Sequence, residues 1–136
     1  MKLLMFHVNE FWYKTFSKTL DKVDNIDKEE KVGKGLVIFI QVEKEDEDRK
    51  NKIKKKAFEN IIWLAKKTNE KEIILHSFGH LSESKSSPEL AQEMIMEIKK
   101  SLEERGYKTQ ATPFGYFLEF KIHVLGESLA KVFKSL

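Results

Sequence analysis

The sequence predicts a single-domain α/β protein in which a mixed β-sheet is covered by helices. Its length of 136 residues suits one domain. The continuous apolar runs at residues 36–40 and 73–75 are typical of strands covered on both faces. Apolar residues at helical spacing follow each run, so strands and helices alternate along the chain. No internal repeat, low-complexity segment or linker divides the sequence.

The first part of the chain is predicted to contain strands and one long loop. Residues 2–8 are apolar and short, which indicates a buried first strand. Residues 11–16 are aromatic and favour a second strand, which we expect to pair back on the first. Residues 21–35 are charged and contain two glycines, which predicts a loop or a short edge element. The run at 36–40 then forms a core strand.

A dense block of charges at residues 43–56 leads into the first predicted helix. Such a block is typical of a solvated loop that continues into the polar face of a helix. We expect this helix to end near Lys67, where Asn69 can stop it, and residues 73–75 to form a third core strand. The apolar residues at helical spacing are Ile53, Ala57, Ile61, Leu64 and Ala65.

The second predicted helix has a clear start and a clear end. Ser86 or Ser87 can cap it, and Pro88 suits its first turn. Glu89 places a negative charge at the positive end of the helix dipole. Gly106 can terminate the helix. The buried stripe consists of Ala91, Met94, Ile95, Ile98 and Leu102.

The last part of the chain predicts two strands and a closing helix. Residues 107–111 favour a strand. Apolar and polar residues alternate at 117–124, which predicts a strand with one buried face. Gly126 breaks that strand, and we expect a short helix after it. The inner face of this closing helix would hold Leu129, Val132, Phe133 and Leu136.

The composition excludes several kinds of chemistry. The absence of cysteine excludes disulfides, thiolate metal ligands and cysteine nucleophiles. The histidines lack the spacing of a zinc site, and no P-loop, G-x-S-x-G or G-x-G-x-x-G motif occurs. We therefore expect no metal and no cofactor. The four histidines are His7, His76, His80 and His123.

The ends and the charge of the chain predict a cytoplasmic protein that does not contact membranes. Residues 1–6 are apolar but too short for a signal peptide. No apolar run approaches the roughly 18 residues that a membrane span needs. The net charge of +3 does not by itself indicate a nucleic-acid binder.

Two glycine-containing turns are candidate ligand sites. Residues 77–82 leave the end of a core strand, and residues 112–116 enter a late strand. In open α/β sheets, ligands bind outside the carboxyl ends of strands. A glycine beside an aromatic residue lets the backbone approach a ligand while the ring stacks on it. Taken separately, each turn is also compatible with an ordinary loop.

The order of the motifs resembles the archaeal editing domain of threonyl-tRNA synthetase. That family carries F-A-H-L-S, L-K-E-R-G-[FY] and A-P-F-G-[YW] at matching intervals. The corresponding segments here are F-G-H-L-S at 78–82, E-E-R-G-Y at 103–107 and T-P-F-G-Y at 112–116. V-E-K at 42–44, F-K-I at 120–122 and an apolar strand ending at His7 also match, so the resemblance covers nearly the whole chain.

The resemblance implies a fold shared with D-aminoacyl-tRNA deacylases, and a homodimer. It also implies a pocket for the aminoacyl 3′ end of tRNA and a possible association with a threonyl-tRNA synthetase. His80 matches the pocket histidine and is the candidate catalytic residue. Because the chain ends soon after the domain, we expect activity in trans. The candidate substrate-binding residues are Val42, Glu43, Phe78, Gly79, Phe114, Gly115, Tyr116 and Phe117.

The sequence departs from the family at polar positions of the pocket. Phe117 replaces a tyrosine, and Leu118 replaces the lysine that the family uses to assist hydrolysis. Lys131 stands where the family has a glutamate. We therefore consider Lys131 a candidate catalytic ammonium that reaches the pocket from the closing helix. The alternative is a solvated surface lysine, because Lys131 lies opposite the apolar stripe of that helix.

The motifs and the departures from the family leave three hypotheses for the function. The first is trans-acting hydrolysis of the ester in mischarged seryl-tRNA(Thr), impaired by the loss of the family lysine. Ester hydrolysis needs a positioned water and a stabilised oxyanion, and leucine supplies neither. The second is a catalytically silent module that binds a tRNA 3′ end or an aminoacyl-nucleoside. The third is an accessory protein that shares only the fold.

Overall fold

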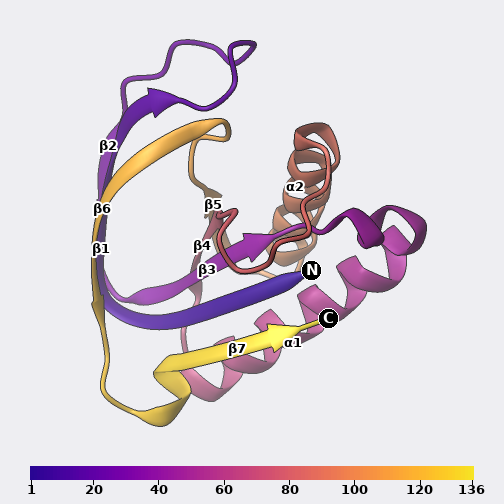
Figure 1. Ribbon diagram of the computed structural model, residues 1–136. Helices are drawn as coiled ribbons and strands as arrows, with labels where there is room; N and C mark the ends of the chain where they lie inside the picture. Colours follow the sequence, from indigo (N-terminus) through magenta and orange to yellow (C-terminus); the bar gives the residue numbers. More distant parts are fainter.

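The computed structural model describes residues 1–136 as one curved seven-stranded sheet with two α-helices (Figure 1). The strand order is β2-β1-β3-β4-β5, and β6 and β7 also pair with β1. β3, β4 and β5 are parallel, whereas every pairing of β1 is antiparallel. The predicted α/β class with a mixed sheet is confirmed.

The elements have the following bounds. The strands are β1 (Lys2–Lys18), β2 (Glu29–Val32), β3 (Gly35–Gln41), β4 (Glu72–Ser77), β5 (Lys108–Ala111), β6 (Tyr116–Val124) and β7 (Lys131–Ser135). The α-helices are α1 (Lys50–Thr68) and α2 (Pro88–Glu104), and the short 3₁₀ helices are η1 (Lys44–Arg49) and η2 (Ser128–Ala130).

β1 is a single strand of 17 residues that serves both halves of the sheet. Its first half pairs with β3 on one side and β7 on the other, and its second half pairs with β2 and β6. The register against β6 shifts between Val8 and Glu10, and a bulge of this kind bends a strand. The prediction of two strands folded back on each other was wrong, because the polar residues Asn9 and Glu10 lie inside one bent strand.

Two hydrophobic clusters fill the interior, one on each face of β3. The larger contains 21 buried residues, including Leu36, Ile38 and Ile40, and lies between the sheet and both helices. The smaller contains 7 buried residues, including Val37 and Phe39, and is covered by apolar residues of β6. Alternation along a strand sends neighbouring side chains to opposite faces. Figure 1 shows both helices on the same side of the curved sheet.

The helix boundaries follow the predicted signals. The Ser87 side chain caps α2 and accepts a hydrogen bond from the Leu90 N–H at 3.2 Å, and Pro88 opens the helix. Gly106 follows α2 with a φ of 88°, and Asn69 ends α1 with a φ of 55°. Both residues adopt the left-handed conformation that is common just beyond helix ends. No helix in the structure is both long and apolar enough to cross a membrane.

The predicted closing helix was wrong. Residues after Gly126 form only the short η2, and the chain then continues as β7, which pairs with β1 between Lys2 and Phe6. Without β7 this stretch of β1 would be a sheet edge with unpaired backbone groups. The Leu136 N–H also donates to the Met1 carbonyl at 2.9 Å. A tertiary partner therefore outweighs the local helical pattern.

Candidate functional site

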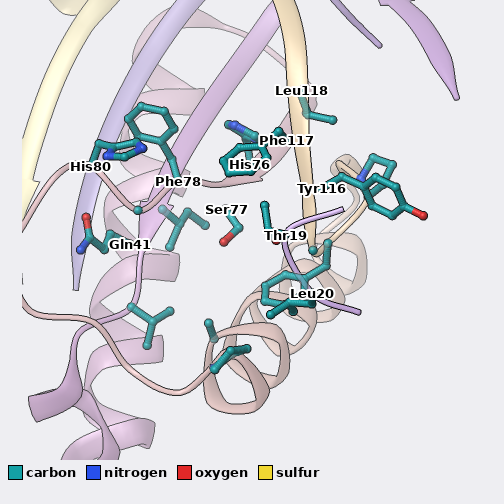
Figure 2. Close-up of a pocket in the computed structure, with 18 of the residues that line it drawn as sticks. Thr19, Leu20, Gln41, His76, Ser77, Phe78, His80, Tyr116, Phe117 and Leu118 are labelled. Atoms are coloured by element: carbon teal, nitrogen blue, oxygen red, sulfur yellow. The ribbon is translucent and has the colours of Figure 1, made fainter. Parts of the chain in front are cut away.

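A cavity of about 530 Å³ opens at the carboxyl ends of the parallel strands β3 and β4 (Figure 2). Its volume lies within the roughly 300–1,000 Å³ range of small-molecule sites. Its 21 lining residues come from five parts of the chain. These parts lie within residues 19–20, 40–42, 76–80, 85–91 and 113–120. The two turns that were predicted to form a site therefore line the same cavity.

Eight of the predicted site residues line this cavity, namely Val42, Phe78, Gly79, His80, Phe114, Gly115, Tyr116 and Phe117. Figure 2 shows Phe78 and His80 on one side of the cavity, and Leu20 and Tyr116 on the other. Glu43 and Lys131 are not among the lining residues.

Gln41 holds the turn that carries His80. Its side-chain Oε1 accepts hydrogen bonds from the backbone N–H groups of Leu81 at 2.6 Å and Ser82 at 2.8 Å. Its Nε2 donates to the carbonyls of Ser82 at 2.8 Å and Ser84 at 2.9 Å. One buried amide thus satisfies four backbone groups of the loop. Sequence reasoning missed Gln41, because a glutamine at the end of a strand gives no local signal of this role.

The His80 ring packs edge-on against the Phe78 ring, with centroids 5.2 Å apart. Phe78 is in turn fixed by the Phe39 ring at 4.9 Å and by a backbone hydrogen bond to the Ile40 carbonyl at 2.9 Å. His80 itself is exposed at the cavity. The turn therefore presents an accessible imidazole on a fixed aromatic support.

The turn at residues 112–116, across the cavity from His80, requires a glycine at position 115. Its φ is 80°, which side chains other than glycine rarely adopt, and an added Cβ would lie 2.7 Å from Cγ1 of Val23. The Gly115 carbonyl accepts a hydrogen bond from the Thr19 N–H at 2.7 Å. The hydroxyl of Tyr116 accepts one from the Ile26 N–H at 2.8 Å. The segment after β1 is thereby held against the cavity wall.

His76 is a buried polar group in the cavity wall. Its side chain lies between aromatic rings, including Phe39 at 5.0 Å, and only 6% of the residue is exposed. Burial lowers the pKa of His76 to about 4, so its ring is neutral at pH 7. Nδ1 lies 2.9 Å from the Thr112 hydroxyl, and Nε2 forms no hydrogen bond within the protein. The sequence showed the histidine but not its position in the cavity.

Glu43 ties the N-terminus to the loop after β4. Its carboxylate accepts hydrogen bonds from the Met1 ammonium at 2.8 Å, Lys2 Nζ at 3.0 Å and the Ser82 hydroxyl at 2.7 Å. Burial raises the pKa of Glu43, but these three donors outweigh burial and hold it at about 2. The side chain thus supports the loop from behind instead of facing the cavity.

Lys131 lies outside the cavity. It begins β7 in an extended conformation, and its Nζ donates to the Leu125 carbonyl at 2.9 Å. The sequence predicts Lys131 on a helix from which it could reach the cavity. In β7 its side chain binds Leu125 instead and does not line the cavity. Leu118, which the sequence predicts to replace a lysine of the family, does line the cavity and packs against the smaller hydrophobic cluster.

The cavity combines apolar walls with few polar groups. Its basic side chains are His76, His80 and Lys85, and no carboxylate lines it. Sequence reasoning missed Lys85, which lies in a loop rich in serine and lysine. No group of three or more histidine and carboxylate side chains is placed to hold a metal ion. The arrangement suits a ligand with aromatic and polar parts.

Comparisons with known proteins agree with the resemblance in the sequence. A model of the archaea-specific editing domain of threonyl-tRNA synthetase matches residues 1–136. The chain is 34% identical to the threonine–tRNA ligase of Pyrococcus furiosus over 139 residues, covering 100% of this chain and 22% of that protein. The threonine–tRNA ligase of Methanosphaera stadtmanae gives the same identity and the same coverage. The chain thus spans about a fifth of the length of these relatives.

A solved structure supports the fold. The c-Myc DNA Unwinding Element Binding Protein matches with a TM-score of 0.66 at 13% identity, over 100% of this chain and 99% of that chain. At this identity the likeness concerns the fold alone. It supports the predicted single-domain α/β fold with a mixed sheet.

Proposed function

The chain belongs to the archaea-specific editing-domain family of threonyl-tRNA synthetase, and from this premise we propose that it hydrolyses the ester of mischarged seryl-tRNA(Thr) in trans. One observation carries the proposal. The histidine turn and the proline-phenylalanine-glycine turn line one cavity of about 530 Å³. Phe78 and Phe114 offer aromatic surface for a base, and Gly79 and Gly115 allow the backbone to approach the ligand.

In the proposed reaction, water attacks the ester carbonyl carbon, and the bond between that carbon and the ribose oxygen breaks. The water proton passes to the ribose oxygen, so the products are serine and tRNA with a free terminal hydroxyl. His80 is the exposed imidazole of the cavity and is assigned to position the water and relay its proton. Backbone N–H groups of the turns are assigned to stabilise the oxyanion.

A second candidate function is binding without turnover. The observation that favours it is the Leu118 side chain on the cavity wall, at the position where the family has a lysine. Loss of a group that stabilises the oxyanion typically lowers the rate by about 10²–10³. A relative with such a loss can still hold an aminoacyl-nucleoside, because the aromatic and glycine positions of the cavity are retained.

We also propose a homodimer and contact with a threonyl-tRNA synthetase as partners. Support for a protein interface comes from exposed aromatic side chains, since Phe16, Phe117 and Phe133 are 78%, 58% and 52% exposed. Sedimentation equilibrium over a range of protein concentrations tests the dimer, and a single monomeric species at every concentration contradicts it.

A deacylation assay distinguishes the two functions. The chain is mixed with seryl-tRNA(Thr) or threonyl-tRNA(Thr), next to the variants His80→Ala and His123→Ala. His123 is an exposed histidine of β6 outside the cavity and serves as the matched control. Selective serine release that is lost only in His80→Ala supports the hydrolase. Binding of a non-hydrolysable seryl-adenosine amide without turnover supports the second function, and absence of both binding and turnover overturns both.

A further inference from the structure

Lys85 is the one residue with a permanent side-chain charge in the lining of the cavity. The other 20 lining residues include no aspartate, glutamate or arginine and no second lysine. Lys85 is exposed, so its ammonium lies at the opening of the cavity and not in its interior. An anionic group that enters or leaves the cavity therefore passes one positive charge, the Lys85 ammonium.

The backbone around Lys85 is held on both sides. The Ser84 carbonyl accepts a hydrogen bond from Gln41 Nε2 at 2.9 Å, and the Ser86 N–H donates to the Val42 carbonyl at 3.0 Å. The end of the side chain lies over Gly79, because Cε and Nζ are each 3.6 Å from the point where a Cβ of Gly79 would be. The ammonium is thus directed to the turn that carries His80.

No carboxylate neutralises this ammonium. Lys50, Lys54 and Lys99 pair with glutamates on and between the two helices, whereas Lys85 takes part in no ion pair within 4.0 Å. A cation without a partner beside an apolar cavity attracts an anionic part of the ligand, and phosphate oxygens are favourable acceptors for an ammonium.

An aminoacylated nucleotide has one anionic part. Its base and ribose are neutral, and its α-amino group is cationic near neutral pH, so only the phosphate carries negative charge. The phosphate also connects the terminal nucleotide to the rest of the tRNA, so it must lie at the opening when the aminoacyl end is inside.

We propose that Lys85 binds the 5′-phosphate of the terminal nucleotide and thereby makes the cavity favour a tRNA end over a free aminoacyl-nucleoside. This inference rests on the proposed function of the same cavity. It assigns Lys85 to substrate binding at the opening, and it leaves the reacting ester to His80 and the backbone.

Calorimetry with two probes tests the assignment. The probes are the seryl-3′-amide of adenosine with and without a 5′-phosphate. We expect the unchanged chain to bind the phosphorylated probe about fivefold more tightly, as for one partly exposed ion pair. Lys85→Met should bind both probes equally, and Lys85→Arg should keep the preference. Lys100→Met removes an exposed lysine of α2 outside the cavity and should behave as the unchanged chain.

A second readout uses tRNA itself. The slope of log affinity against log salt concentration should be smaller by about 0.7 in Lys85→Met, the change expected for one phosphate contact to a single strand. Equal binding of both probes by the unchanged chain overturns the assignment and leaves the proposed function intact. So does a loss in Lys85→Met that is the same for both probes, since Lys85 would then act on the ester or the base. Failure to bind either probe overturns the proposed function and the assignment together.

Discussion

His76 Nδ1 lies 2.9 Å from the Thr112 hydroxyl, which joins the end of β4 to the residue after β5 beneath the cavity. The histidine is enclosed by aromatic rings and lies in a cavity wall, so protonation would place a charge in an apolar environment. Burial in this wall therefore favours the neutral ring.

This arrangement predicts a pH dependence of stability. The pKa of His76 is about 4 in the folded chain, against a value near 6.5 for an unperturbed histidine. Between these values the unfolded chain binds the extra proton, so the free energy of unfolding is highest above pH 6.5 and falls as the pH falls to 4. The loss is at most about 3 kcal/mol. Urea denaturation from pH 7 to pH 4.5 measures it.

The variant His76→Gln is the control for that dependence, because glutamine can still bond Thr112 but does not titrate. Its stability should change much less between pH 6.5 and 4.5. An unchanged slope in His76→Gln would show that another group titrates in this range.

The lowered pKa of Glu43 predicts a second loss of stability, at a more acidic pH. Its folded pKa of about 2 is below the ordinary value of 4.5, so the stability it contributes is complete above pH 4.5 and is lost as the pH falls toward 2. Glu43→Gln should lower the free energy of unfolding at pH 7 by about 1–3 kcal/mol, since it leaves the buried Met1 ammonium with a weaker partner. Glu47→Gln, at an exposed position of η1, should be nearly neutral. Equal effects of the two substitutions would contradict the role of Glu43.

The local parts of this fold could be predicted from the sequence. The Ser87 cap and the alternation in β6 depend on neighbouring residues, so both appear in the structure as expected. β7 could not be predicted in this way, because its conformation depends on an open edge of β1 that lies more than 100 residues earlier in the chain. The bend at Asn9 is likewise explained only by the pairing with β6.

The residues of the candidate site also fall into two groups, those with a local sequence signal and those without one. The two glycine-containing turns, residues 77–82 and 112–116, have local sequence signals. Their order along the chain also matches the family that the sequence resembles, so both were identified. Gln41, His76 and Lys85 have no such signal, because their roles come from contacts or placements between distant segments. Glu43 follows Val42 in a matching motif, yet Val42 lines the cavity whereas the Glu43 carboxylate binds the Met1 ammonium.

Gly115 predicts a steric effect with two separable parts. Gly115→Ala places a side chain at a φ of 80° and brings its Cβ to 2.7 Å from Val23, so we expect a loss of about 2–4 kcal/mol of stability and weaker binding of seryl-adenosine amide. Adding Val23→Ala should recover only the steric part. Gly126→Ala has open space and no positive φ, so it should cost little. Thermal denaturation of the three variants checks the order, and similar losses for Gly115→Ala and Gly126→Ala would contradict it.

Leu118 and Lys131 give opposite predictions for catalysis. Leu118→Lys brings an ammonium into the cavity wall, where it can stabilise the developing oxyanion, so the single-turnover rate of serine release should rise by about tenfold or more. The same change removes apolar packing, and stability should fall by about 1–3 kcal/mol. Lys131→Ala removes an ammonium that binds the Leu125 carbonyl outside the cavity, so its rate should equal that of the unchanged chain. A rate that falls in Lys131→Ala and does not rise in Leu118→Lys would mean that the ammonium acts from β7, against the placement of both side chains.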